Sequence, residues 1–491
     1  MSDRHVRAYA LPSWALEPSH LRSAPVGSGL EIHCPDRDAA WMAELAAGLR
    51  SLSTRRGGSA ATVQGDTDAV RRARSLGAVG RRFLDPDDEL RRDALALLPQ
   101  TSGLSGAMSE VVLDGMAADW VPERLVRLLT EELGDPSPLD RFVDRGDRSV
   151  MAVAPRLCVQ LVAGSVPGVG VSALLRSLLL GAPTLLKPGL GDVVLPVLFA
   201  QALAEEDPAL AARLAVVYWP GGETDMEDAA LSPADVAVVY GSDRTVASVE
   251  ARVRAGTRFV GYHHREGVGV VGAGVLGSAP VAARCASDVA RAVALFDQRG
   301  CVSPRVVYVE AAPVAPLATG PAAFARLLAV AFERLEADLP SGSLDRTERS
   351  GVHQLRGTAE MLSAGLEGGP ADTWVAHGGA APWTVVYDPD RALETSCVGR
   401  TVVVRPFRGL EDLIAMLEPA GPHLQTVGVA GLGDRMLEVA AWVGRIGASR
   451  VTSFASVPFP SPWWHHDGRG PLSDLVRWTD LERSGEPGDA S

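Results

Sequence analysis

Cys301 is the residue of this chain that is best placed for covalent chemistry. It lies in the segment Phe-Asp-Gln-Arg-Gly-Cys-Val-Ser-Pro of residues 296–304, between a helical stretch at Ser287–Leu295 and an apolar strand at Val306–Val309. A thiol between helix and strand, beside a glycine, has backbone N–H groups within reach. Such groups can hold a developing oxyanion or lower the pKa of the thiol. A buried structural cysteine is the alternative, since free cysteine is among the most buried residue types.

The elements that must position this thiol follow a regular alternation. Short apolar runs alternate with helical stretches between Val150 and Glu310, which predicts a parallel sheet covered on both faces. Such sheets bind ligands at the carboxyl ends of their strands. The predicted strands are Leu157–Ala163, Thr184–Lys187, Leu214–Tyr218, Val236–Tyr240, Thr257–Val260 and Gly267–Val271, and the predicted helices are Ser172–Leu180, Val193–Glu205 and Thr245–Ala255.

The same alternation returns after Cys301 and predicts a second α/β unit. Its expected strands are Val306–Val309, Trp383–Tyr387 and Thr401–Val404, and its expected helices are Pro321–Leu335 and Gly409–Glu418. Before the first unit, leucines at spacings of three and four predict a helix over Val121–Leu133. Residues 1–85 show little pattern, and Ser51–Gly65 is typical of a loop or linker.

Composition limits the classes of partner. The 491 residues include 46% hydrophobic and 22% charged residues, which is enough apolar material for more than one core. The net charge of −13 and the lack of a dense Lys/Arg block exclude a typical nucleic-acid binder. No stretch has the length and apolarity of a membrane span or signal peptide. The cysteines are odd in number and widely spaced without zinc-ligand patterns, so we expect free thiols, no metal and a cytoplasmic location: Cys34, Cys158, Cys285, Cys301 and Cys397.

Five pieces of the sequence, in order, resemble the aldehyde dehydrogenase superfamily. They are LVAGSVPG (161–168), LLKPG (185–189), VVYGSDRTV (238–246), FDQRGCVSPRVVYVE (296–310) and PWWHHDGRGPLSDLVRW (462–478). Within that superfamily the chain is most similar to the acyl-CoA reductase family, known from the fatty acid reductases of luminous bacteria. The resemblance covers about residues 90–480. It implies an α/β fold with two doubly wound parallel-sheet domains: a nucleotide-binding domain over 86–270, a catalytic domain over 271–430 and a C-terminal segment over 431–491 that packs on the core or a subunit contact.

The resemblance also implies roles for individual residues. Cys301 matches the nucleophile that accepts the acyl group. Lys187 matches the lysine that contacts the adenosine ribose, and Gly241 and Ser242 match the turn that approaches the cofactor. Ser165 stands where the family usually has an oxyanion-hole asparagine. A serine can still donate a hydrogen bond, but this departure predicts a weaker oxyanion site or a changed activity.

Cofactor choice depends on the residues after the lysine. NAD-preferring relatives often carry an acid three positions later, where this chain has Leu190. The missing carboxylate favours NADPH, with NADH as the alternative, although Asp192 is close in sequence.

Glu266 is the candidate general base. Many hydrolytic members of the superfamily have a water-activating glutamate at a similar distance before the cysteine, but the local match, His-Arg-Glu-Gly, is poor. A reductase would not need such a base, since water would destroy its thioester intermediate. A solvated charge near a strand start is the alternative for Glu266, and an ordinary histidine pair is the alternative for His263 and His264.

Three further motifs do not support separate functions. Gly267–Gly272 reads GxGxxG, but the glycines fall within an apolar run, which favours a strand with close backbone approach over a dinucleotide loop. Gly164–Ser172 lacks the Gly-Lys-Ser/Thr of an ATP-binding loop. Trp463–Asp467 offers adjacent histidines without a third ligand at useful spacing, so we expect packing near the active-site entrance rather than metal binding.

Together these observations predict NADPH-dependent reduction of an acyl-CoA or acyl-carrier thioester to an aldehyde, through an acyl-enzyme on Cys301. Two alternatives stay open. One is a non-acylating aldehyde dehydrogenase with Glu266 as base, and the other is a non-catalytic relative that binds a partner. The superfamily also implies a homo-oligomer, and an acyl-supplying partner enzyme is compatible with the predicted reaction.

Overall fold

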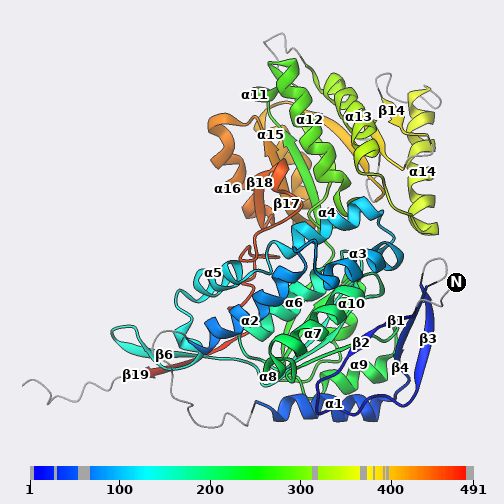
Figure 1. Cartoon of the computed structure of the whole chain (residues 1–491). Helices are drawn as coiled ribbons and strands as arrows, with labels where there is room; N and C mark the ends of the chain where they lie inside the picture. The colour runs from blue at the N-terminus through cyan, green and yellow to red at the C-terminus, as the bar shows by residue number, and fades with distance from the viewer. Residues whose placement is uncertain are drawn as a thin grey trace, which may run out of the picture.

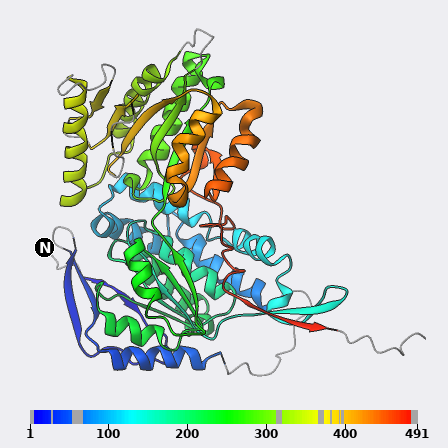
Figure 2. The same ribbon diagram turned by 180° about the vertical axis from the view of Figure 1, so that it is seen from behind.

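The computed structural model describes residues 5–26, 30–53, 67–311, 319–364, 373–379, 382–390, 393 and 398–482. Two α/β units lie one above the other, and the C-terminal chain descends from the upper unit along the side of the lower one (Figure 1). The reverse view shows the same descent (Figure 2). Most of the predicted Ser51–Gly65 loop, and Cys397, lie outside these residues. Within the described ranges, no helix has the length and apolarity needed to cross a membrane.

The lower unit is built on a six-stranded sheet in the order β11-β10-β7-β8-β9-β2. All neighbours are parallel except β2, which pairs antiparallel with β9. Its strands are β2 (Tyr9–Ala10), β7 (Cys158–Leu161), β8 (Thr184–Lys187), β9 (Leu214–Val217), β10 (Val236–Tyr240) and β11 (Arg258–Tyr262). The chain runs outward from β7 to β9 and then crosses to β10 on the other side of β7, which places the reversal of strand order between β7 and β10. The predicted parallel sheet is confirmed for five of its expected strands, whereas the sixth, Gly267–Val271, belongs to the sheet of the upper unit.

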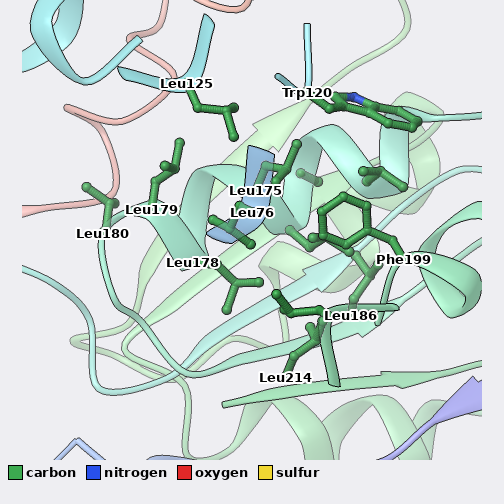
Figure 3. Packing of buried hydrophobic residues seen from close by; sticks show 14 of the residues in the cluster. Leu76, Trp120, Leu125, Leu175, Leu178, Leu179, Leu180, Leu186, Phe199 and Leu214 are labelled. Carbon is green, nitrogen blue, oxygen red and sulfur yellow. The ribbon is translucent and has the colours of Figure 1, made fainter. Parts of the chain in front are cut away.

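Alternate side chains of this sheet pack into two cores. Leu186 and Val216 face one side, against α2, α5, α6 and α7, while Leu185 and Ala215 face the other, against α1, α9 and α10. Figure 3 shows the first core, where Leu175, Leu178 and Leu179 of α6 lie among residues of neighbouring elements. The helices are α1 (Ala39–Ser51), α2 (Asp68–Arg82), α5 (Pro122–Leu133), α6 (Val169–Leu179), α7 (Val194–Glu206), α8 (Pro208–Ala211), α9 (Thr224–Leu231) and α10 (Asp243–Glu250).

Two more helices, α3 (Glu89–Ser102) and α4 (Gly106–Ala117), lie where the lower unit meets the upper one (Figure 1). In both views α4 lies at the junction of the two units (Figures 1 and 2). Its buried Met108 and Val112 pack with Leu295 and with Phe296, the first residue of the segment 296–304 that contains Cys301. The loop that carries Cys301 is thus in contact with the lower unit.

The upper unit has a seven-stranded sheet in the order β14-β15-β16-β13-β12-β17-β18, parallel except for β14. The strands are β12 (Glu266–Val271), β13 (Pro304–Glu310), β14 (Trp374–His377), β15 (Thr384–Tyr387), β16 (Thr401–Phe407), β17 (Leu424–Ala430) and β18 (Arg450–Ser453). The helices are α11 (Ala273–Leu276), α12 (Ala279–Ala294), α13 (Pro321–Asp338), α14 (Arg346–Ser363), α15 (Gly409–Leu417) and α16 (Met436–Ile446). Helices α12 and α13 cover one face, and α15 and α16 cover part of the other. The second predicted α/β unit is confirmed.

The GxGxxG segment forms β12, in the middle of this sheet, so the expected strand is confirmed. A Cβ on Gly267 would lie 2.3 Å from the carbonyl oxygen of Val302. The glycine therefore permits close contact between β12 and the loop that follows Cys301.

Two smaller sheets complete the structure. In one, β4 (Leu30–Pro35) lies between β1 (His5–Arg7) and β3 (Leu21–Val26). In the other, β6 (Arg148–Val153) lies between β5 (Val143–Asp144) and β19 (Arg477–Glu482). The elements within residues 1–85, namely β1 to β4, α1 and α2, were not predicted. Most side chains of β3 are exposed or half-buried, so this strand lacks the apolar alternation that identifies a strand.

Candidate active site

The segment before Cys301 forms an unusual turn. Phe296, Asp297 and Gln298 have φ values of 58°, 48° and 64°, in the left-handed region that non-glycine residues rarely adopt. Side-chain contacts hold this conformation. The Asp297 carboxylate accepts from Arg400 Nε at 2.9 Å, and Gln298 bonds both the N–H and the C=O of Thr401, at 2.7 and 2.5 Å. The side chains of Asp297 and Gln298 thus hold the turn that precedes Cys301, the predicted nucleophile.

Arg299 connects this turn to both units. Its guanidinium donates to Glu348 of α14 at 2.9 and 3.0 Å, and to the carbonyl oxygens of Ser102 and Ser343 at 3.2 and 2.8 Å. Because Ser102 ends α3 and Glu348 lies in α14, the nucleophile loop is fixed to helices from both sides of the junction.

Cys301 is half-buried and free. The pKa of its thiol is raised to about 11, mainly by burial and also by the negative charge of Asp467. Gln425 and the backbone N–H groups of Cys301 and Val302 act in the opposite direction by hydrogen bonding to the sulfur. These amides are the donors expected beside a thiol at a helix-to-strand junction. In this environment the sulfur is a protonated thiol at neutral pH, so a nucleophilic role requires a proton acceptor.

The C-terminal segment lies directly against Cys301. His466 Nε2 is 4.0 Å from the sulfur, and so is Gln425 Nε2 of β17. Gln425 also donates to the Asp467 carboxylate at 2.7 Å, which ties this segment to the upper sheet. The tail thus lies against the predicted nucleophile. The sequence did not single out His466 or Gln425 as active-site residues, because Gln425 lies 124 positions from Cys301 and His466 lies 165 positions away.

A predominantly apolar cavity of about 150 Å³ opens beside the thiol. Its lining combines the nucleophile loop with α4, α5, α6 and the residues at 458–466, so both units and the tail contribute walls. Apolar side chains dominate this lining, including Met116, Leu125, Leu128, Val166, Val169, Leu175, Phe296, Phe459 and Trp464. This apolar lining suits an apolar group held beside the sulfur.

The predicted cofactor residues lie at the carboxyl ends of strands in the lower sheet. Lys187 ends β8, and Gly241 and Ser242 follow β10. Ser242 caps α10, its hydroxyl accepting from Thr245 N at 3.2 Å. Burial lowers the pKa of Lys187, while Glu227 and Glu223 oppose that effect. This edge includes the strand-order reversal beside β10, where doubly wound sheets bind nucleotides.

Ser165 lies in the loop between β7 and α6 and is exposed. Its neighbour Val166 lines the cavity around Cys301, whereas Ser165 itself is outside that lining. The buried Asp192 holds this loop, accepting from the backbone N–H of Gly168 at 2.7 Å and of Gly170 at 2.6 Å. The Asp192 carboxylate is therefore engaged with the α6 end of the loop.

Glu266 is not brought into the cavity lining within the described part of the chain. Its carboxylate lies 3.3 Å from His264 Nε2 and 3.3 Å from Arg305 Nη1. The hydrogen bond from His264 lowers the pKa of Glu266, with Arg305 acting in the same direction. A carboxylate that is already paired and lies outside the cavity lining gives no support to the non-acylating alternative. His263 lies 3.5 Å from Asp243, at the surface.

Comparison with known proteins identifies the family of this chain and proteins of similar fold. Residues 75–478 match the family described as acyl-CoA reductase (LuxC). A long-chain acyl-protein thioester reductase of Aliivibrio fischeri is 23% identical over 418 residues, covering 83% of this chain and 81% of that protein. Two solved structures, each 14% identical, have similar folds. An oxidoreductase from Marinobacter aquaeolei has a TM-score of 0.71 with 95% of each chain covered, and an NAD-dependent aldehyde dehydrogenase from Sinorhizobium meliloti has a TM-score of 0.70 with 99% and 96% covered.

Proposed function

This chain belongs to the acyl-CoA reductase (LuxC) family, and on that premise we propose that it reduces an acyl thioester to an aldehyde with NADPH, through an acyl-enzyme on Cys301. The observation that carries the proposal is the position of the Cys301 thiol, which lies at one wall of an apolar cavity between the two units. We assign cofactor binding to residues 86–270 and the nucleophile to residues 271–430.

The sulfur of Cys301 loses its proton as it attacks the thioester carbonyl, and the carrier sulfur leaves as a thiol. Bound NADPH would supply the hydride that reduces the acyl carbon. The resulting thiohemiacetal oxyanion collapses, its C–S bond breaks, and the aldehyde leaves with Cys301 regenerated. The backbone N–H of Cys301 is oriented toward the sulfur and is our main oxyanion donor, with Ser165 as the second. We assign no step to Glu266, because its carboxylate is already paired.

The lining of the cavity supports a long acyl chain as the substrate, in keeping with the names of the curated relatives. Val169 begins α6 and is half-buried in the wall. A larger side chain there should fill the part of the cavity beyond the carbonyl. Val169→Phe is expected to reduce activity on long acyl-CoAs more than on short ones. Equal losses for all chain lengths would contradict this assignment.

Substitution of the nucleophile tests the proposal directly. Cys301→Ala should abolish both covalent labelling by radioactive acyl-CoA and aldehyde formation from acyl-CoA with NADPH. Cys285→Ala is the matched control, because Cys285 is a free cysteine buried in α12, outside the cavity lining. Full aldehyde formation by Cys301→Ala would overturn the proposal.

NADPH as the preferred cofactor is supported by the charges near Lys187, the single lysine of the sequence. Leu190 supplies no carboxylate, and Asp192 is occupied by the backbone of the α6 loop. Glu223 is neutralised by Arg22, which binds it at 2.7 and 2.9 Å. The arrangement leaves Lys187 free to receive a ribose phosphate.

Because Lys187 is the only lysine, an amine-reactive reagent reads out cofactor binding without turnover. NADPH should protect Lys187 from modification, as measured by peptide mass spectrometry, and NADH at equal concentration should protect it less. Lys187→Met should raise the Kd for NADPH about tenfold or more, by loss of a charge-assisted contact. Equal protection by the two cofactors would argue against the NADPH preference.

We propose that the chain forms a homo-oligomer through the sheet β5-β6-β19. This sheet extends from the lower unit (Figures 1 and 2), and Trp478 and Leu481 of β19 are exposed apolar side chains. Trp478→Arg together with Leu481→Arg should reduce the mass measured by light scattering. A cytoplasmic location, where thiols stay reduced, is part of the same proposal, as is a partner enzyme that supplies the acyl group.

A further inference from the structure

Cys301 needs a proton acceptor, and His466 is the one imidazole among the described residues that line the cavity. Its Nε2 atom lies 4.0 Å from the thiol sulfur. The other polar contact of the sulfur with a side chain is the Gln425 amide, which donates and cannot take up a proton. His466 is therefore the side chain that can exchange a proton with the nucleophile.

The ring of His466 is held in a fixed orientation. It is stacked between Tyr262, with centroids 4.4 Å apart and planes at 20°, and Trp464, at 4.8 Å and 19°. Tyr262 in turn stacks on Tyr240, which accepts a hydrogen bond from Arg176 at 3.0 Å. A row of four rings thus extends from the end of β10 to the tail, and His466 is the member that contacts the sulfur.

The backbone around His466 is anchored on both sides. Before it, Arg450 of β18 donates to the carbonyl oxygens of Val457 and Ser456, at 2.8 and 2.5 Å. After it, Asp467 adopts a left-handed conformation with φ 52° and is bonded to Gln425. These contacts keep the imidazole against the thiol without a covalent link.

The charged and titratable groups around the ring keep it neutral. The pKa of His466 is lowered to about 4, mainly by burial and also by the positive charges of Arg176 and Arg265. Asp467 acts in the opposite direction, with its carboxylate 3.7 Å from Nε2. The remaining titratable neighbours are the Tyr240 and Tyr262 phenols and the Cys301 thiol, while Arg450 lies over Trp464 at 5.8 Å. At neutral pH one ring nitrogen is therefore available as an acceptor.

We propose that His466 is the base of the acylation step, taking the Sγ proton of Cys301 as the sulfur attacks the thioester. As the C–S bond to the carrier breaks, the imidazolium gives this proton to the leaving sulfur, which departs as a thiol. The step consumes and releases no net proton, and needs no oxidant or reductant. This role rests on the proposed acyl-enzyme mechanism and names a residue for it.

The test is the rate at which iodoacetamide alkylates Cys301 in the full chain without cofactor, from pH 6 to pH 11. Peptide mass spectrometry follows the Cys301 peptide alone. His466→Phe keeps an aromatic ring in the stack and removes the base, and His466→Gln keeps a polar side chain. His465→Phe is the matched control, because the adjacent histidine has 65% of its side chain exposed.

The wild-type chain and His465→Phe should share a rate plateau between about pH 6 and pH 8. Both His466 variants should lose about a hundredfold at pH 7.5, and their rates should rise with hydroxide concentration across the whole range. If His466 served only packing, His466→Phe would retain the wild-type plateau. A His466→Phe profile that coincides with that of the wild type would overturn the proposal.

This measurement separates the two levels of inference. Alkylation needs neither a thioester nor NADPH, so it reports only on the Cys301–His466 pair. If the plateau depends on His466 while Cys301→Ala still forms aldehyde, the proposed acyl-enzyme mechanism is wrong. His466 would still be the base that deprotonates Cys301. If Cys301→Ala abolishes aldehyde formation while the plateau survives in His466→Phe, the reductase stands and the base is wrong.

Discussion

Asp297 and Arg400 form an ion pair in the interior, with a distance of 2.9 Å from Arg400 Nε to Asp297 Oδ1. Their side chains are 2% and 1% exposed. Arg400 also bonds Glu336 at 2.7 Å and the carbonyl oxygen of Leu339 at 2.8 Å. The left-handed turn before Cys301 is thus attached to the start of β16 and the end of α13, which explains why an aspartate stands four positions before the nucleophile.

Removal of Asp297 should destabilise the fold strongly. Asp297→Ala leaves the buried Arg400 with a single carboxylate partner, and breaking a buried pair on one side costs about 3–5 kcal/mol of unfolding free energy. Chemical denaturation of the purified chain measures this change. Asp480→Ala is the control, since its pair with Arg148 is about half exposed and should contribute less than about 1 kcal/mol. Equal effects of the two substitutions on the unfolding free energy would contradict a strong stabilising role for the buried Asp297–Arg400 pair.

Gly189→Ala should weaken cofactor binding. A Cβ on Gly189 would lie 2.1 Å from the backbone nitrogen of Gly164, so the loops after β8 and β7 would have to separate. Because Lys187 directly precedes the loop after β8 and Ser165 lies on the loop after β7, we expect the Kd for NADPH to rise about tenfold and the free energy of unfolding to fall by about 1–3 kcal/mol. Gly277→Ala is the control, with no atom within 4 Å of the added Cβ. Wild-type affinity in Gly189→Ala would show that the loops can separate without cost.

Asp467→Asn should lower the pKa of the Cys301 thiol, because the Asp467 charge contributes to raising it. The effect is read most clearly in the His466→Phe background, where alkylation depends on the thiolate alone. A fall of one pKa unit gives about tenfold faster alkylation at pH 8. Asp474→Asn, which alters a surface pair with Arg469, should leave this rate unchanged. A slower rate in Asp467→Asn would show that the Asp467 charge does not raise the pKa of the Cys301 thiol.

Asp192 should make stability depend on pH. Burial raises its pKa to about 7 despite the two backbone donors, from 3.8 for an ordinary aspartate. The folded state therefore retains a proton that the unfolded chain releases, so this stabilising contribution is complete below about pH 3.8 and is lost as the pH rises through 7. The loss in unfolding free energy between pH 5 and pH 8 should be smaller in Asp192→Asn than in the wild type. An unchanged loss would assign the pH dependence to other groups.

The sequence was sufficient to locate β7 to β11 of the lower sheet and β12, β13, β15 and β16 of the upper one, because buried parallel strands are continuous apolar runs. It did not locate β17 and β18 of the upper sheet. It also singled out the segment around Cys301, since this residue lies beside glycine at a helix-to-strand junction. It did not reveal why Asp297, Gln298 and Arg299 surround it, because their partners lie far along the chain. Local periodicity contains no information on such contacts.

The same limit applies to the tail and to residues 1–85. His466 lies in a stretch without a regular element, so neither helical nor strand spacing could direct its side chain toward Cys301. In the N-terminal sheet, β1 has three residues and alternating exposure, which is too short a run for a pattern to stand out. The structure of both regions depends on contacts between residues that lie far apart in the sequence.

After β18 the chain forms one wall of the cavity beside Cys301 and then reaches β19, which pairs with β6 of the lower unit. Residues 457–482 follow β18, the last strand of the two large sheets, so they are synthesised after every strand of these sheets. Cys301 would contact His466 only when residues 457–482 have packed against both units. Reactivity toward thioesters is then acquired at the end of folding, and a nascent chain with two formed sheets would still be inert.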